Sequence, residues 1–403
     1  MRVQRDDVIS TRGSTRATGY AMSCKMITEK DKTFVAWLDF LADIKMRVLD
    51  RTTGMWSDPV LVGKGVDNHS GPAMTMDSKG HICIVYGPHH GPFKFRKTLL
   101  PWDISKWGPE EKVGVFGTYP SLIRGPDDTL HLTYRGGAMP RRIMYQRKPT
   151  GKPWSEPLEL VDSKAPSGYT QYGNALAIDA DNCLHLVFHI YDTHPKGGKA
   201  AGYLRSPDAG RTWETVDGAK VTLPATPDTP CFFAQGKNLD MRTSNVALSK
   251  DGHPFVLTSQ LKQKPTGATL WSHDGKEWQR RELLPIISKH LPGRSVGMHG
   301  TLTFDRNGRL FVTLVTAKAP GGGWGHPSWE VALLTSDDEG KTFAVQELSA
   351  RNPKRAAWLS SIERPYCDKL VSMPLGVLYM RGSAGKGCTE GETSEVHALF
   401  LEE

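Results

Sequence analysis

The chain has 403 residues and a formal net charge of +8 at pH 7. No apolar run reaches the roughly 18 residues needed to cross a membrane, and the first residues lack the apolar core of a signal peptide. The basic residues are dispersed and an aromatic RNA-binding signature is absent, which argues against a nucleic-acid partner. The surplus of positive charge favours an anionic partner instead.

One pattern recurs along the chain: an apolar strand, a tight polar turn and a second strand. Asp, Asn and Gly tolerate the left-handed backbone of hairpin turns, and the flanking β-branched and aromatic residues suit strands. In chain order the turns lie at residues 29–32, 77–80, 125–128, 179–182, 250–252, 305–308 and 374–376. Hairpins at intervals of roughly 45 to 70 residues are typical of propeller blades. The sequence therefore predicts an all-β, seven-bladed β-propeller.

The repeats leave no linker between them, so residues 1–403 are expected to form a single domain. The alternating strand at residues 396–401 is expected to pair with the N-terminal segment and close the ring. Residues 206–213 and 336–343 share the pattern Ser-x-Asp-x-Gly-x-Thr-Trp/Phe, and residues 272–278 carry a shortened copy. These segments resemble the Asp-box turn of sialidase-like propellers, whose Asp and Ser side chains bind backbone amides.

Each hairpin places the start of its first strand and the end of its second strand on the face opposite the turn. Residues about eight positions before and after each turn should therefore line one mouth of the ring. These positions are rich in histidine, tyrosine and arginine. They are Asn68, His69, His89, His90, Tyr119, Tyr134, Arg135, Tyr172, Asn174, His189, Tyr191, Arg242, Asn245, Gln260, His299, Arg364 and Arg381.

The residue types at this mouth suit the removal of an acidic C–H next to a carboxylate. Histidine accepts a proton near neutral pH, tyrosine can transfer one, and arginine binds a carboxylate through two parallel hydrogen bonds. Trp324, in the glycine-rich residues 321–325, is expected in a loop at the same mouth, where its ring can stack on a sugar.

The six cysteines are scattered without the spacing of a metal site or a disulfide framework. Cys83 and Cys183 lie inside apolar strands, where buried thiols are the expected interpretation. Cys183 and His185 share one strand face and could hold a structural metal ion with partners from elsewhere in the chain. We therefore expect no required cofactor and no catalytic metal, with a structural metal ion as the alternative.

Residues 20 to 382 resemble a family of BNR-repeat propellers that includes the seven-bladed ulvan lyases and the rhamnose–glucuronate lyases. The most specific stretches are residues 67–73, 86–89, 92–97, 130–137 and 144–147. The resemblance implies that His69 and His89 are the histidines of the active site, that Tyr134 is the catalytic tyrosine and that Arg147 neutralises the uronate carboxylate.

Further residues of the mouth are expected to bind substrate. They are Asn68, His90, Arg135, Tyr172, His189, Arg242, His299, Trp324 and Arg364, among which His90 and Arg135 are alternatives for the second histidine and for the arginine.

The expected activity is β-elimination on a uronate-containing anionic polysaccharide, which gives a 4,5-unsaturated uronate. An arginine would bind the carboxylate, His69 or Tyr134 would remove the C5 proton, and Tyr134 or His89 would protonate O4. A sialidase-like glycoside hydrolase and a non-catalytic carbohydrate-binding propeller are the alternatives, because this fold serves many activities. We expect a monomer, and the resemblance implies an extracellular or periplasmic location, although the sequence leaves a cytoplasmic location open.

Overall fold

The computed structural model describes residues 1–166, 171–195, 197–237, 239, 241–260, 266–318, 324–382 and 393–403, with residues 171 and 172 described by their backbone. Strands dominate this part of the chain, which contains one α-helix, α1 (Leu284–His290), and one 3-10 helix (Phe40–Ala42). The prediction of an all-β chain is confirmed. No helix among the described residues is long and apolar enough to cross a membrane.

The described strands form six sheets, and paired strands are antiparallel. The first sheet contains β2 (Met26–Glu29), β3 (Lys32–Leu38), β4 (Asp43–Asp50) and β5 (Met55–Trp56), with β6 (Val60–Lys64) also paired to β4. The second contains β7 (Ala73–Met76), β8 (Ile82–Tyr86), β9 (Gly91–Lys97), β10 (Glu111–Arg124), β11 (Leu130–Gly136), β12 (Arg142–Lys148) and β13 (Leu158–Val161).

The other four sheets have four strands each. The third contains β14 (Gln171–Ile178), β15 (Leu184–Ile190), β16 (Lys199–Ser206) and β17 (Phe232–Gly236), and the fourth contains β18 (Arg242–Leu248), β19 (Pro254–Gln260), β20 (Gly267–His273) and β21 (Trp278–Glu282). The fifth contains β22 (Arg294–Phe304), β23 (Leu310–Lys318), β24 (Glu330–Ser336) and β25 (Ala344–Glu347), and the sixth contains β26 (Ala357–Ile362), β27 (Leu375–Arg381), β28 (Ser394–Glu402) and β1 (Arg2–Gly13).

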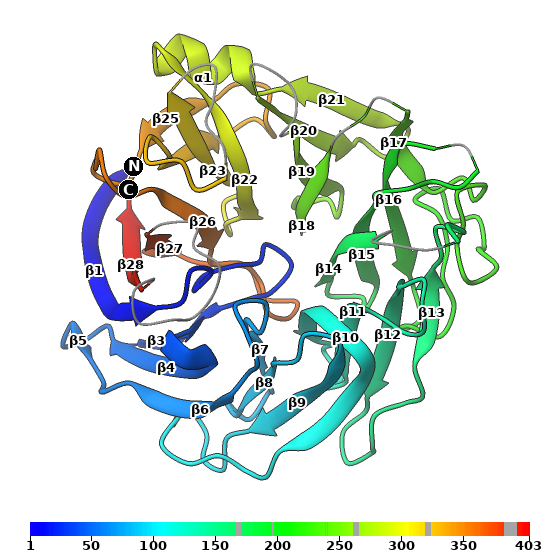
Figure 1. Cartoon of the computed structure of the whole chain (residues 1–403), viewed down its shortest axis with the longest axis horizontal. Helices are drawn as coiled ribbons and strands as arrows, with labels where there is room; N and C mark the ends of the chain where they lie inside the picture. The colour runs from blue at the N-terminus through cyan, green and yellow to red at the C-terminus, as the bar shows by residue number, and fades with distance from the viewer. Residues whose placement is uncertain are drawn as a thin grey trace.

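The sheets are arranged around a common centre, with β7, β10, β14, β18, β22 and β26 toward the middle (Figure 1). In this series β7 contacts β10, and the contacts continue through β14, β18 and β22 to β26, while β7 also contacts β2. In the second sheet, β10 pairs with β9 through residues 111–117 and with β11 through residues 118–124, so one long strand joins two groups of strands. The N-terminal strand β1 pairs with β28 beside β27, which brings the two ends of the chain together (Figure 1).

The hairpin turns form because an aspartate side chain binds the backbone of its own turn. Asp77 Oδ1 accepts hydrogen bonds from the backbone N–H groups of Lys79 and His81, at 3.1 and 2.8 Å. Asp179 and Asp305 bind the second and fourth residues after them in the same way. These aspartates hold the turns at one end of the strands and leave the opposite end to other loops.

The first Asp-box is a second kind of turn and is held by side-chain hydrogen bonds. Asp208 Oδ1 accepts the backbone N–H of Thr212 at 2.8 Å, its Oδ2 accepts the Thr212 hydroxyl at 2.7 Å, and Ser206 Oγ accepts the Gly210 N–H at 2.8 Å. Trp213 is buried among the residues between the second and third sheets. Residues 336–343 repeat these hydrogen bonds.

Replacing Asp208 by alanine should lower the free energy of unfolding by roughly 1–2 kcal/mol, because backbone N–H groups of the turn lose their acceptor. Urea unfolding measures the difference. Asp338→Ala, in the second Asp-box, should have a similar effect, whereas the control Asp58→Ala removes an exposed carboxylate that holds no such turn. Equal midpoints for Asp208→Ala and Asp58→Ala would contradict a structural role for the box.

Candidate active site

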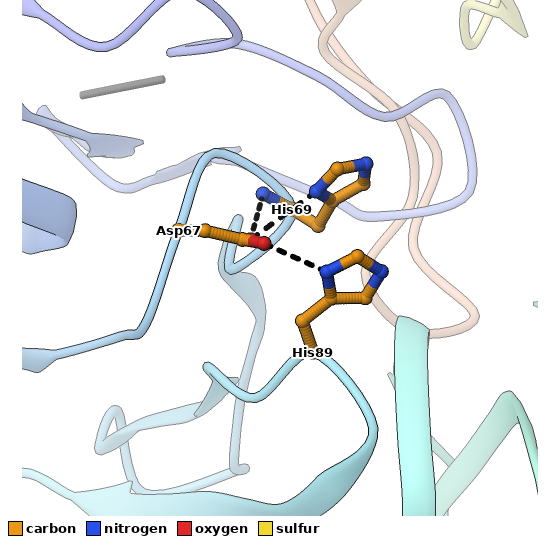
Figure 2. Close-up of side chains that lie close together, drawn as sticks. All are labelled: Asp67, His69 and His89. Atoms are coloured by element: carbon orange, nitrogen blue, oxygen red, sulfur yellow. Dashed lines mark hydrogen bonds and ion pairs between the residues drawn. The ribbon is translucent and has the colours of Figure 1, made fainter. Parts of the chain in front are cut away.

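The predicted mouth of the ring is built from loops at the end of the strands opposite the hairpin turns. The loop of residues 67–72 lies between β6 and β7, and residues 87–90 lie between β8 and β9. The backbone N–H of Gly87 donates to the Ser70 carbonyl at 3.1 Å, which fixes the two loops against each other. The side chains of Asp67, His69 and His89 meet between these loops (Figure 2).

Asp67 binds both histidines. Its Oδ1 lies 3.2 Å from His69 Nδ1, and its Oδ2 lies 2.7 Å from His89 Nδ1. Burial alone would raise the pKa of this carboxyl, but the hydrogen bonds from His69 and His89 outweigh burial and hold the pKa well below its usual range. An ionised carboxylate can only accept, so each imidazole carries its proton on Nδ1. The Nε2 atom of each neutral ring is then a proton acceptor.

The two Nε2 atoms have different surroundings. His69 Nε2 lies 2.6 Å from Arg16 Nη1, and burial, together with the charges of Arg16 and His89, lowers the pKa of His69. His89 Nε2 is buried and has no hydrogen-bond partner among the described residues. The rings of His69 and His89 are stacked with centroids 4.1 Å apart. Of the two imidazoles, His89 is therefore the one whose Nε2 is not engaged by a described residue.

Two tyrosines face the histidines. Arg16 Nη1 donates to the Tyr20 hydroxyl at 2.5 Å, and the Tyr20 ring is stacked with His69 at 6.2 Å. The Tyr119 ring packs edge-on against Tyr20 at 4.7 Å and lies 6.2 Å from His69. Both tyrosines are almost completely buried.

Arg135 packs against the ring of Tyr119, and Arg141 lies near the same histidines. Arg135 Cζ lies 4.8 Å from the centre of the Tyr119 ring. Burial and the charges of His89, Arg135 and Arg141 lower the pKa of His90 to about 4, so this imidazole stays neutral near pH 7 beside two guanidinium groups. The site thus combines a histidine oriented by a carboxylate with a positively charged region that suits a carboxylate.

Buried lysine and arginine side chains hold the N-terminal segment that carries Tyr20. Lys25 Nζ donates to the carbonyls of Tyr20 and Ser23 at 2.9 and 3.2 Å, and Arg364 Nη1 donates to the Ala21 carbonyl at 2.6 Å. Burial, reinforced by the charge of Arg364, lowers the pKa of Lys25 well below its usual value. Ser23 Oγ donates to the Pro120 carbonyl at 2.6 Å, which ties this segment to the residue after Tyr119.

Asn68 also acts on the N-terminal segment, because its Nδ2 donates to the Thr15 hydroxyl at 3.0 Å. Asn68 and Arg364, both predicted to bind substrate, are therefore placed where they bind the protein itself. The two residues are buried, with exposed fractions of 4 % and 7 %.

Tyr20 also lines a small pocket. Four residues predicted to bind substrate, His189, Arg242, His299 and Trp324, line the same pocket. It is lined by Tyr20, Ala21, Met22, His189, Arg242, Thr243, Met298, His299 and Trp324. Arg242 Cζ lies 5.5 Å from the centre of the Trp324 ring. The backbone N–H of Thr243 donates to His189 Nδ1 at 3.2 Å, so neutral His189 carries its proton on Nε2.

Tyr134 and Arg147 are not brought to this site. Tyr134 is fully buried, donates to Gln146 Oε1 at 2.9 Å and packs edge-on against Phe93, while burial raises the pKa of its hydroxyl. Arg147 pairs with His131, which precedes Arg135 by four residues on β11. Arg147 therefore lies about 13 Å closer to the hairpin turns than Arg135 does.

The remaining predicted residues divide as follows. His69, His89, His90 and Arg135 meet at the site, whereas the side chain of Tyr172 lies outside the described residues, as do residues 321–323 before Trp324. Sequence analysis missed Asp67, Arg16 and Tyr20, and it placed Tyr119 at the mouth without choosing it. The signal for Asp67 was its position two residues before His69 in the most specific stretch.

Two groups of His, Cys, Asp and Glu in the described part of the chain are close enough to share a metal ion. One is Asp67, His69 and His89, and the other is Asp179, Cys183 and His185. In the first group each Asp67 oxygen already accepts an imidazole N–H, which is the arrangement that orients a histidine base.

Comparison with known proteins identifies the family. Residues 32–284 match the model of the BNR repeat-containing family, and the chain belongs to this family. The chain is 24% identical over 304 residues to an ulvan lyase of Nonlabens ulvanivorans. This alignment covers 61% of this chain and 63% of that protein. The chain is also 24% identical over 254 residues to an ulvan lyase of Pseudoalteromonas sp. (strain PLSV), covering 53% of this chain and 51% of the relative. The matches thus span about three fifths of the first relative and half of the second.

Solved structures agree on the fold. A PL25 ulvan lyase bound to -[GlcA(1-4)Rha3S]- superimposes with a TM-score of 0.75 at 16% identity, over 97% of this chain and 95% of that one. The polysaccharide lyase Uly1 superimposes with a TM-score of 0.66 at 11% identity over the whole of both chains. The resemblance to BNR-repeat polysaccharide lyases inferred from the sequence is confirmed.

The buried imidazole of His299 should make stability depend on pH. Burial, together with the charge of Arg242, lowers the pKa of His299 to about 3, whereas an unfolded histidine titrates near about 6.5. Between these values the unfolded chain binds the extra proton, so the free energy of unfolding falls as the pH drops. At pH 5 this amounts to roughly 2 kcal/mol.

Urea unfolding at pH 7 and pH 5 tests this expectation in the wild type and in His299→Gln. The variant should lose less stability between the two pH values, because glutamine does not titrate. Identical losses in both proteins would mean that His299 is not held neutral by the fold.

Proposed function

We propose that this protein is a polysaccharide lyase that cleaves a uronate-containing anionic polysaccharide by β-elimination. The observation that carries the proposal is His89, a histidine oriented by Asp67, whose ring is stacked on His90, the imidazole that lies near Arg135 and Arg141. A base next to a carboxylate-binding region is what abstraction of a proton α to a carboxylate requires.

In this mechanism Arg135 binds the uronate carboxylate and stabilises the negative charge that develops when C5 loses its proton. His89 Nε2 takes the C5 proton, and the C–H electron pair forms the C4–C5 double bond as the C4–O4 bond breaks. Tyr119, located between His69 and Arg135, donates its hydroxyl proton to the departing O4. The protonated His89 then returns a proton to Tyr119, so water is not consumed.

Tyr119 and Arg135 take the roles that the sequence resemblance gave to Tyr134 and Arg147. Tyr134 is enclosed in the core of the second sheet, and Arg147 lies toward the opposite end of its strand. Tyr119 packs against Tyr20 and Arg135, and its ring lies 6.2 Å from that of His69, which is stacked on His89.

We also propose that the fold is a seven-bladed β-propeller. The second sheet divides at β10 into β7–β9 and β10–β13, which together with the other five sheets gives seven groups of strands around the centre. The ulvan lyases among the relatives support an ulvan-like substrate and, with the sequence resemblance, an extracellular or periplasmic location. A cofactor is not required for this chemistry.

A glycoside hydrolase is less well supported by the same residues. Such enzymes generally use two carboxyl groups separated by roughly 5 to 9.5 Å. The site residues named above include a single carboxylate, that of Asp67, where a hydrolase needs two. Its two oxygens already accept hydrogen bonds from His69 and His89. A non-catalytic carbohydrate-binding protein remains the second alternative, which the following experiment addresses.

Incubation with ulvan, glucuronan, rhamnose-capped glucuronates and glycosaminoglycans should raise the ultraviolet absorbance of the unsaturated uronate with at least one polymer. His89→Ala and Tyr119→Phe should each lower kcat by roughly 10²–10⁴-fold, because each removes a proton-transfer group. Arg135→Ala should also raise KM through the lost carboxylate contact.

Matched controls are Tyr134→Phe and Arg147→Ala, which should keep most of the activity because neither side chain reaches the site. Loss of activity in Tyr134→Phe with retention in Tyr119→Phe would overturn the assignment of the tyrosine. New reducing ends without absorbance would indicate hydrolysis, and sugar binding without any product would indicate a non-catalytic protein.

A further inference from the structure

A second cluster of reactive side chains lies at the opposite end of the strands, on the face of the hairpin turns. Asp179 and Cys183 belong to the turn between β14 and β15, and His185 is the second residue of β15. Their ligand atoms all lie within 4.8 Å of one another. These residues also line a cavity of about 690 Å³, and His189, at the other end of β15, lines the pocket of the active site.

The carboxylate is fixed by its own turn. Asp179 Oδ1 accepts the backbone N–H groups of Asp181 and Cys183 at 3.0 and 2.9 Å, which directs Oδ2 toward His185. Oδ2 lies 3.2 Å from His185 Nε2. Two ligands of a tetrahedral zinc ion at 2.0–2.1 Å are separated by about 3.3 Å, so these two atoms already have the spacing of ligands.

The imidazole is fixed from its other side. His185 Nδ1 lies 2.5 Å from the hydroxyl of Tyr203, which comes from the neighbouring strand β16 and is buried. Histidines that bind metals generally donate their second N–H to such a partner, which sets the ring orientation and leaves Nε2 for the ion. His185 is itself 4 % exposed, so its orientation depends on this contact.

The equivalent turn of the second sheet shows how a carboxylate in this position is otherwise neutralised. There Asp77 Oδ2 lies 2.6 Å from Nζ of Lys97, and Lys97 pairs with Cys83, six residues after the aspartate. In the third sheet the residue paired with His185 is Arg205. Its Nε lies 2.6 Å from Glu214 Oε1, so this cation is directed to a different carboxylate.

We propose that Asp179, Cys183 and His185 bind a zinc ion, with a water molecule from the cavity completing the coordination. A thiolate, an imidazole and a carboxylate together suit zinc better than magnesium or calcium, which prefer oxygen ligands alone. The ion would join the two ends of the β14–β15 turn and so stabilise the third sheet. This site is independent of the proposed lyase reaction.

The zinc content of the purified chain and the absorption spectrum of its cobalt-substituted form test the proposal. The wild type should bind one zinc ion per chain, and cobalt should give a thiolate-to-metal charge-transfer band. Cys183→Ser should lose this band and the bound zinc, whereas Cys83→Ser, in the strand that follows the equivalent turn of the second sheet, should retain both. Added zinc should raise the Tm of the wild type and of Cys83→Ser, and leave that of Cys183→Ser unchanged.

His185→Gln provides a second variant if Cys183→Ser does not fold, and it should also lose zinc. Absence of stoichiometric zinc together with absence of the charge-transfer band would overturn the proposal. Zinc that is retained in Cys183→Ser and lost in His89→Ala would place the ion at Asp67 and would also overturn it. These measurements use no substrate, so their outcome does not depend on whether the chain is a lyase.

Discussion

The candidate active site depends on one carboxylate that accepts hydrogen bonds from two imidazoles. Asp67 binds Nδ1 of both His69 and His89, and this single constraint fixes both tautomers. His69 then accepts from Arg16, which also donates to Tyr20, while His89 keeps a basic Nε2 for a ligand. If the carboxylate were lost, the rings would be free to rotate and to exchange tautomers, so proton abstraction would lose its direction.

The site is completed by parts of the chain that are distant in sequence. The segment carrying Arg16 and Tyr20 precedes the first sheet in the sequence. Lys25 and Arg364 donate hydrogen bonds to its backbone carbonyls, and Ser23 donates one to the Pro120 carbonyl. Lysine and arginine side chains tolerate burial when their N–H groups find acceptors such as these backbone carbonyls. The ring of sheets thus supplies a rigid support on which loops from several sheets arrange the reactive groups.

The regular features of this arrangement could be predicted from the sequence. The period of apolar strands and polar turns identified the strands, and the distance from the turns placed His69, His89, His90 and Arg135 at one mouth. Both Tyr134 and Arg135 were expected at the mouth, but neighbouring residues of a strand point to opposite faces, so Arg135 packs against Tyr119 while Tyr134 packs against Phe93. The roles of Arg16 and Tyr20 arise from contacts with residues about 50 to 100 positions away, which local patterns do not encode.

The most direct test of this account is the tautomeric state of His89, measured by nitrogen-15 NMR of histidine-labelled protein near neutral pH. The signals among the 14 histidines are assigned by comparison with His69→Ala and His89→Ala. The account predicts that both His69 and His89 carry a proton on Nδ1 and that His89 Nε2 is unprotonated. A neutral His89 protonated on Nε2 would contradict it, because that ring could not accept the C5 proton of a bound uronate.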